Sequence, residues 1–152
     1  MTEPLDILHH QATAVWIDGQ CLLIEGAPGS GKSSLALALI DRGAALIGDD
    51  GVSLERDGTR LVASPVPATC GLLEVRNLGI IEIAPVMLGV PVALVVLLDR
   101  EAPRFITEPE IITLHGVELP RIRLWPDTPV LPLRAERALQ HYGLPPPRPV
   151  ST

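Results

Sequence analysis

The segment with the clearest chemical meaning is a glycine-rich octapeptide near the start of the chain. It reads Gly26-Ala27-Pro28-Gly29-Ser30-Gly31-Lys32-Ser33, is followed by Ser34, and matches the pattern G-x-x-x-x-G-K-[ST]. Glycines let successive backbone N–H groups turn inward around an anion, and a following helix points its positive end at the same place. In such loops the lysine reaches the β- and γ-phosphates and the serine hydroxyl holds Mg²⁺. The segment predicts a nucleoside triphosphate site at residues 26–34; an ordinary glycine-rich turn is the alternative.

Two adjacent carboxylates, Asp49 and Asp50, are the first candidates to act on a bound phosphate. They follow a short apolar segment, 44–47, which we expect to be a strand. The carboxyl edge of a sheet is where α/β proteins place ligands. Two carboxylates there could supply a metal contact and a base for the acceptor hydroxyl. A plain Asp-Asp-Gly turn is the alternative, and the pattern alone does not assign the two roles.

An acidic and a basic residue, Glu74 and Arg76, stand two positions apart within the apolar segment 72–83. In an extended chain, side chains two residues apart share a face. Glu74 could therefore bind Mg²⁺ while Arg76 faces the phosphates. A surface ion pair on an edge strand is the alternative.

Two further residues are weaker candidates. His10 stands just before the first predicted hairpin, where a surface or capping role is the alternative. Arg104, like Arg100, follows the predicted central strand and so lies near a sheet edge. Either arginine could reach a phosphate, and a solvated arginine is the alternative.

The elements that must position these residues follow from the hydrophobic pattern. It predicts hairpins over 13–25 and 52–63, a helix over 32–42, a buried central strand over 92–98 and a last helix over 133–142. Apolar residues surround the axis of the 32–42 helix, which predicts burial on most of its sides. The expected fold is α/β, a mixed sheet around one central helix. Residues 1–144 are expected to form one domain, followed by a proline-rich tail, 145–152.

Composition excludes several classes of function. The chain has 152 residues, a net charge of −6 and no basic run, which excludes a protein that binds nucleic acid phosphates. The start of the chain lacks the features of a signal peptide, and the longest apolar run, 90–98, is too short for a membrane span. Cys21 and Cys70 have no metal-site spacing and are expected to be reduced thiols. We therefore expect a cytoplasmic protein without a membrane partner.

A longer set of residues carries a resemblance to a known family. In chain order the set comprises His10, the octapeptide, Leu35-Ala36-Leu37, Asp41-Arg42-Gly43-Ala44, Asp49-Asp50 and Leu72-Leu73-Glu74-Val75-Arg76-Asn77-Leu78-Gly79-Ile80-Ile81. Over residues 9–90 the sequence resembles the catalytic domain of HPr kinase/phosphorylase in its short, single-domain form. The resemblance implies a P-loop mixed sheet around a central P-loop helix, like the core of HPr kinase and phosphoenolpyruvate carboxykinase.

The resemblance also implies an activity and roles for residues. The activity is that of an ATP-dependent protein-serine kinase acting on HPr or a paralogous phosphocarrier of the phosphotransferase system, which regulates carbon or nitrogen metabolism. Lys32 and its loop would bind ATP, and Ser33 and Glu74 would hold Mg²⁺. The Asp49-Asp50 pair would supply the acid/base, with Asp50 favoured by its spacing from Lys32. His10 and Arg76 would support the phosphates, Arg104 matches a further family arginine, and the chain would form a homo-oligomer, a hexamer by resemblance.

The family's second reaction and two other functions remain as alternatives. In the second reaction inorganic phosphate attacks phosphoserine, and the basic Pro-x-Arg/Lys-Pro-Gly loop linked to it is not recognisable near residues 121–134. The sequence therefore favours the kinase reaction over the phosphorylase reaction. Asn77 stands where the family has glycine, and asparagine is the least costly replacement if φ is positive there. A non-catalytic ATP-binding sensor and a small-molecule P-loop kinase are the two other functions.

Overall fold

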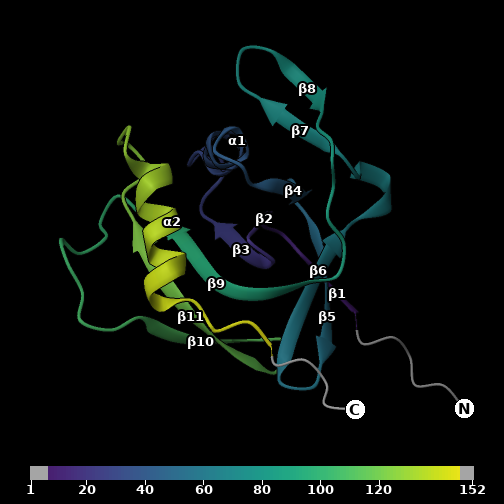
Figure 1. The fold of residues 1–152 in the computed structure, drawn as a ribbon. Helices are drawn as coiled ribbons and strands as arrows, with labels where there is room; N and C mark the ends of the chain where they lie inside the picture. Colours follow the sequence, from purple (N-terminus) through teal and green to yellow (C-terminus); the bar gives the residue numbers. More distant parts are fainter. Residues whose placement is uncertain (1–6, 148–152) are drawn as a thin grey trace, which may run out of the picture.

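The computed structural model describes residues 7–147, and these form a mixed α/β fold (Figure 1). Most of the proline-rich tail expected over 145–152 lies outside the described residues, from 148 onward. The elements are β1 (Ile7–His10), β2 (Thr13–Ile17), β3 (Gln20–Glu25), α1 (Lys32–Asp41), β4 (Ala45–Gly48), β5 (Val52–Asp57), β6 (Arg60–Pro65), a 3₁₀ turn (Pro67–Thr69), β7 (Leu72–Val75), β8 (Gly79–Glu82), β9 (Val90–Leu98), β10 (Glu110–Leu114), β11 (Val117–Leu124) and α2 (Leu131–Tyr142). Neither helix in this part of the chain is long and apolar enough to span a lipid bilayer.

The long strand β9 organises the main sheet, whose order is β1-β5-β6-β9-β3-β2-β4 with β11 and β10 branching from β9. Its first residues pair with β6, and the rest pairs in parallel with β3 on one side and β11 on the other. Seven of its nine residues are buried, and the strand is apolar throughout because both of its faces are covered. The predicted buried central strand is confirmed, with a start two residues earlier.

Each face of β9 and β3 packs into its own core. Leu22, Ile24 and Val96 belong to the core beneath α1 and α2, whereas Leu23 and Val95 belong to a second core against the β5–β6 side. Because successive side chains of a strand point to opposite faces, a strand between two cores must be apolar throughout. Burying a leucine side chain fully contributes about 2–3 kcal/mol, so this pair of strands is a main source of stability.

The two predicted hairpins are confirmed. β2 and β3 pair antiparallel around Asp18 and Gly19, whose φ values of 50° and 85° are those of the tight turn that suits the twist of a hairpin. β5 and β6 pair in the same way. The first hairpin matters for function because it delivers the end of β3 directly into the glycine-rich loop.

The expectation of a helix buried on most sides needs correction. α1 packs against β2, β4, β7 and α2, and it buries Leu35, Ala36 and Leu39. Leu37, which lies between these buried residues in the sequence, is 37% exposed. The helix therefore covers one face of the sheet beside α2, and the sheet curls away from it.

The segment 72–83, in which Glu74 and Arg76 were expected to lie on extended chain, folds back on itself as a hairpin. β7 and β8 form a two-stranded sheet of their own that projects from the main body (Figure 1). The turn between them has Asn77 at φ 73° and Gly79 at φ 112°, so position 77 does need a positive φ, which asparagine adopts at low cost. Exposed Leu78 and Ile80 lie on this hairpin.

Candidate active site

The glycine-rich loop joins β3 to α1 and forms one wall of an open cavity of about 370 Å³. The cavity also takes residues from β2, from the turn after β4 and from the β7–β8 hairpin. Its lining residues are Gln11, Thr13, Gly26, Pro28, Gly29, Gly31, Lys32, Ser33, Ser34, Asp50, Glu74 and Arg76. Residues that are far apart in the sequence and were expected to act together are therefore neighbours here.

The loop has the shape of an anion cradle. A side chain at Gly26 would collide with the hydroxyl of Ser30, so the chain can close this tightly only with glycine. The Ser30 Oγ is buried and has no hydrogen-bond partner among the described residues. Lys32 Nζ donates to the carbonyl oxygens of Gly26 at 3.0 Å and Ala27 at 3.4 Å, which places the ammonium over the loop. A cradle, a helix N-terminus without acidic residues and a lysine across them fit a phosphate chain.

The two adjacent aspartates have different surroundings. Asp49 is half-buried and accepts hydrogen bonds from Ser33 Oγ at 2.6 Å, Thr13 Oγ1 at 3.1 Å and the Glu74 backbone N–H at 2.9 Å. Asp50 is exposed, lines the cavity and has φ 53°. The left-handed backbone at Asp50 turns its carboxylate away from the partners of Asp49. One carboxylate is therefore occupied as an anchor, and the other remains available to a substrate.

Two residues of this cavity were missed by the sequence reasoning. Thr13 is fully buried, and its hydroxyl both donates to Asp49 and accepts the backbone N–H of Asp50 at 3.4 Å. One hydroxyl thus fixes both aspartates. Gln11 lines the cavity from the turn that precedes β2. A buried threonine in a strand looks like an ordinary β-branched residue in the sequence, so no local signal identified it.

Glu74 and Arg76 reach the cavity from the projecting hairpin, as their spacing predicted. The backbone of Glu74 is held by Asp49, while its side chain lines the cavity. A Cβ on Gly29 would lie 3.8 Å from Nη2 of Arg76, so the guanidinium extends over the glycine-rich loop. The hairpin therefore adds one carboxylate and one cation to the phosphate cradle.

His10 does not line this cavity. It ends β1 with its side chain half-buried, and Nε2 lies 2.6 Å from Oε2 of Glu25, the last residue of β3. The contact ties the edge strand β1 to the strand that carries the loop. The structure thus places His10 one position away from the cavity residue Gln11.

Arg104 lies in a different cavity, of about 320 Å³, which it lines together with Arg123, Trp125 and Arg134. A turn closed by the Ala102 N–H and the Asp99 carbonyl carries the chain from the end of β9 toward α2. Arg100, the alternative candidate, pairs with Asp127 at 2.8 Å. Neither arginine lines the cavity of the glycine-rich loop.

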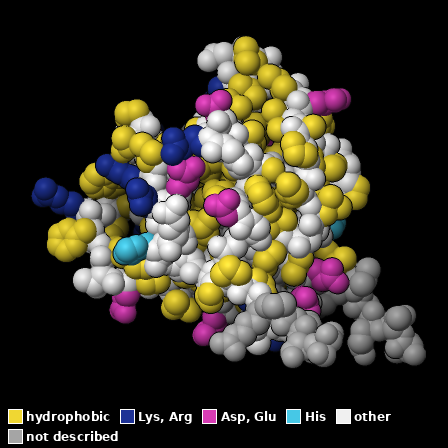
Figure 2. All heavy atoms as spheres, in the orientation of Figure 1, with side chains coloured by type: hydrophobic (Ala, Val, Ile, Leu, Met, Phe, Trp, Pro, Cys, Tyr) yellow, Lys and Arg dark blue, Asp and Glu magenta, His cyan; other side chains and the backbone are white. Residues whose placement is uncertain are grey.

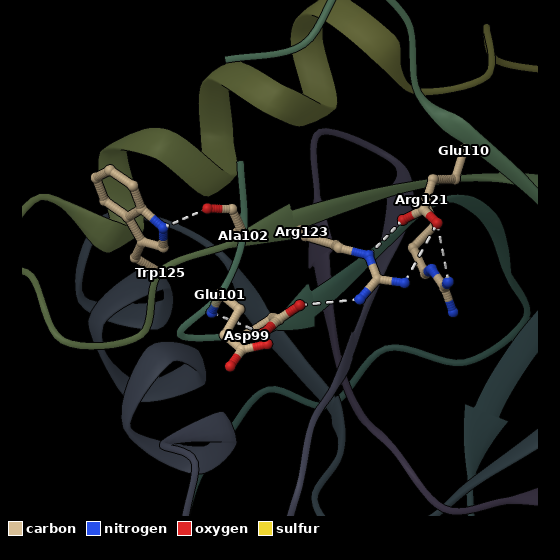
Figure 3. A network of polar contacts seen from close by, with 7 residues as sticks. All are labelled: Asp99, Glu101, Ala102, Glu110, Arg121, Arg123 and Trp125. Atoms are coloured by element: carbon tan, nitrogen blue, oxygen red, sulfur yellow. Dashed lines mark hydrogen bonds and ion pairs between the residues drawn. The ribbon is translucent and has the colours of Figure 1, made fainter. Parts of the chain in front are cut away.

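A network of ion pairs lies beside this second cavity (Figure 3). Arg123 joins Asp99 at 2.9 Å to Glu110 at 2.7 Å, and Arg121 reaches the same Glu110 at 3.2 Å. Hydrogen bonds from Arg123 and Arg121 lower the pKa of Glu110 from 4.5 to about 2. The backbone N–H of Glu101, followed by Arg123, also lowers the pKa of Asp99. The network ties β10 and β11 to the end of β9.

This network predicts a pH dependence of stability. A carboxylate whose pKa is lowered by folding stabilises the protein above its unfolded pKa, and the stabilisation is lost as pH falls through the folded value. For Glu110 the loss should occur between pH values of about 4.5 and about 2. We expect Glu110→Gln to flatten the change of the urea unfolding midpoint with pH across this window. The control is Glu118→Gln, a change of an exposed glutamate on β11, the strand that pairs with β10, and equal slopes in the two variants would contradict the assignment.

The site can now be compared with known proteins. A sequence model of the family described as HPr Serine kinase C-terminal domain matches residues 6–92, more than half of the chain. The chain belongs to this family. The matched region includes the glycine-rich loop, both aspartates and the β7–β8 hairpin, so the family match and the cavity rest on the same residues. The resemblance stated from the sequence is confirmed.

Curated relatives agree with this membership. A protein named HPr kinase/phosphorylase from Chloroherpeton thalassium is 32% identical over 158 residues, covering 89% of this chain and 45% of the relative. One with the same name from Clostridium botulinum (strain Eklund 17B) is 50% identical over 68 residues, covering 44% of this chain and 22% of the relative. The chain thus spans less than half the length of these relatives.

A solved structure of a family member shares the fold. The structure titled as the Hpr(Ser) kinase/phosphatase from Coxiella burnetii superposes with a TM-score of 0.78 and 28% sequence identity. The match covers 88% of this chain and 94% of the solved chain. The similarity therefore extends beyond residue 92 into the part of the chain that the family model does not match.

Proposed function

We propose that this protein is an ATP-dependent protein-serine kinase that acts on HPr or a paralogous phosphocarrier protein. In this proposal α1 and its preceding loop are the nucleotide-binding centre of an HPr kinase and phosphoenolpyruvate carboxykinase-like core. The observation that carries the proposal is the division of labour between Asp49, which holds Ser33, and Asp50, which faces the open cavity. The family membership and the names of the relatives support the choice of substrate.

The proposed reaction moves the γ-phosphoryl group of ATP to a serine hydroxyl. The loop amides and Lys32 hold the phosphate chain, and Arg76 lies over the loop, where negative charge develops. Asp50 accepts the proton of the serine as its oxygen bonds to phosphorus and the bond to the ADP oxygen breaks. Two groups in the cavity, the Ser33 hydroxyl and the Glu74 carboxylate, are oxygen ligands of the kind Mg²⁺ prefers. When bound, Mg²⁺ neutralises charge on the phosphates.

Assembly and location belong to the same proposal. We infer a cytoplasmic homo-oligomer, a hexamer as the family resemblance implies. Leu78 and Ile80 on the hairpin are 73% and 71% exposed, and Phe105 is 80% exposed. Large exposed apolar side chains of this kind support contacts with another protein surface.

The test is transfer to a purified phosphocarrier protein in the presence of ATP and Mg²⁺. We expect intact-mass spectrometry to show a gain of one phosphate on a serine of the carrier, and we expect Lys32→Ala to abolish it. Lys32→Ala removes the ammonium that lies over the loop and truncates a side chain that is only partly buried, so we expect the variant to fold. ATP binding without transfer to the carrier would favour the sensor, and transfer to a metabolite would favour the small-molecule kinase; either result would overturn the proposal.

A further inference from the structure

A second cavity lies next to Trp125, and the proposed reaction leaves it unused. It measures about 320 Å³ and is lined by Ala102, Arg104, Arg123, Trp125 and Arg134, among others. These residues come from the turn after β9, from the end of β11 and from α2. Figure 2 shows Lys and Arg side chains gathered on this side of the molecule, beside α2.

The tryptophan in this cavity is held in place yet remains accessible. Its indole N–H donates to the carbonyl oxygen of Ala102 at 2.7 Å, as Figure 3 shows, and 39% of the side chain is exposed. The guanidinium carbon of Arg134 lies 5.7 Å from the ring centroid. Because the ring and the guanidinium both line the cavity, a flat heterocycle entering it meets an aromatic surface and a guanidinium plane.

The charges in the cavity are unevenly compensated. Arg123 is neutralised by Asp99 and Glu110. Arg104 and Arg134 are exposed and form no ion pair with a carboxylate among residues 7–147. A guanidinium donates hydrogen bonds and accepts none, so these two side chains suit a ligand with ring nitrogens, hydroxyls or phosphate oxygens as acceptors.

The cavity lies on the same sheet edge as the glycine-rich loop. The parallel strands β3, β9 and β11 end together: Glu25 pairs with Leu97, and Leu98 pairs with Leu124. A Cβ on Gly26 would lie 3.3 Å from the Cβ of Leu98, so the loop contacts the end of β9. The backbone at the start of the loop and the backbone of Trp125 are therefore two strand spacings apart across the sheet, about 10 Å.

The two flanks of the loop differ in chemistry. On the β2 and β4 side lie Thr13, Asp49 and Asp50, which suit phosphate, metal and acceptor. On the β9 and β11 side lies the Trp125 cavity. A phosphate chain held at the loop can extend its sugar and base only where room exists, and this cavity offers room on the flank opposite the aspartates.

We infer that the Trp125 cavity binds the base of the nucleotide whose phosphates occupy the glycine-rich loop, with the base stacked against Trp125 and Arg134. The inference rests on the proposed function in that it requires a nucleoside triphosphate at the loop. Stacking of a base on an aromatic side chain typically accounts for about 5- to 150-fold in affinity.

The test compares ATP with inorganic tripolyphosphate, which has the phosphates without the base. In titration calorimetry with Mg²⁺, we expect Trp125→Ala to weaken ATP binding about 5- to 150-fold and to leave tripolyphosphate binding unchanged. Trp125→Phe keeps an aromatic ring and should retain most of the ATP affinity. This variant separates the loss of the stacking ring from a folding defect in the alanine variant. Arg134→Gln should also weaken ATP, whereas Arg137→Gln, exposed on the same helix, is the matched control.

Fluorescence supplies an independent measurement. In a Trp16→Phe background Trp125 is the remaining tryptophan, and we expect ATP but not tripolyphosphate to change its emission. Equal affinities for ATP in the parent and Trp125→Ala proteins, or identical emission responses to the two ligands, would overturn the base site while leaving the kinase proposal intact. Failure of the parent protein to bind either ligand would overturn the kinase proposal and the base site together.

Discussion

An Asp50→Asn variant is expected to bind Mg-ATP nearly as well as the parent and to transfer phosphate about 100- to 10,000-fold more slowly. The amide keeps the size of the side chain but cannot accept the proton of the serine. The backbone should be unaffected, because asparagine tolerates the positive φ of 53° at this position. Steady-state transfer to the phosphocarrier and calorimetric titration with nucleotide measure the two properties separately.

A matched control exists at the other end of β3 from the glycine-rich loop. Asp18 also has a positive φ, 50°, and lies in the β2–β3 turn away from the loop cavity. We expect Asp18→Asn to transfer phosphate at the parental rate. If Asp50→Asn is equally active, Asp50 is not the base.

Asp49→Ala is expected to have the largest effect on stability. The change removes the acceptor of three hydrogen bonds, from Thr13, Ser33 and the Glu74 backbone. Leaving a buried donor unsatisfied costs about 1–3 kcal/mol, and neighbouring losses do not add fully, so we expect a decrease of about 2–5 kcal/mol in the free energy of unfolding. The corresponding decrease in Tm is about 5–20 °C.

The same variant should also loosen the β7–β8 hairpin, because the Asp49 carboxylate accepts a hydrogen bond from the backbone N–H of Glu74 and so ties the hairpin to the loop cavity. Hydrogen exchange at the Glu74 amide should therefore increase more than exchange in β9. Asp41→Ala, exposed at the end of α1, is the control and should change the free energy of unfolding by less than about 0.5 kcal/mol. A stability like that of this control would show that the three hydrogen bonds at Asp49 contribute little.

The features that could be predicted from sequence are those with local causes. The loop 26–33 is fixed by its glycines and the following helix, and the β2–β3 hairpin by Asp18-Gly19. The strand 90–98 is apolar throughout because it lies between two cores. Each of these features is encoded within a few neighbouring residues.

The features that could not be predicted depend on pairings between distant segments. His10 was expected to support phosphates, yet β1 pairs with β5 in a register that places His10 opposite Val52 and its ring against Glu25. Gln11, the residue that follows β1, lines the loop cavity, whereas His10 does not. Arg104 lies in the cavity beside Trp125, which it reaches through the turn after β9, and its predicted part in holding phosphate stays a prediction.

The roles of the aspartates lie between these cases. Their position at a sheet edge followed from the strand before them. The difference between their surroundings depends on the left-handed backbone at Asp50 and on the hydroxyl of Thr13, which contacts both residues. Neither the positive φ of Asp50 nor the contact of Thr13 with the two aspartates could be recognised from the neighbouring sequence. Spacing from Lys32 favoured Asp50, and the exposure of its side chain in the cavity supports the same choice.

The position of β9 has a consequence for how the protein is made. One edge of β3 pairs at once with β2, but the other edge waits for β9, in which Leu94 lies opposite Leu22. A nascent chain that ends before residue 90 already contains the whole octapeptide and both aspartates, yet the strand beneath them has an open edge. Such distant parallel pairing forms slowly and exposes that edge to other chains. We therefore expect the glycine-rich loop to reach its final geometry only after residues 90–98 have paired with β3.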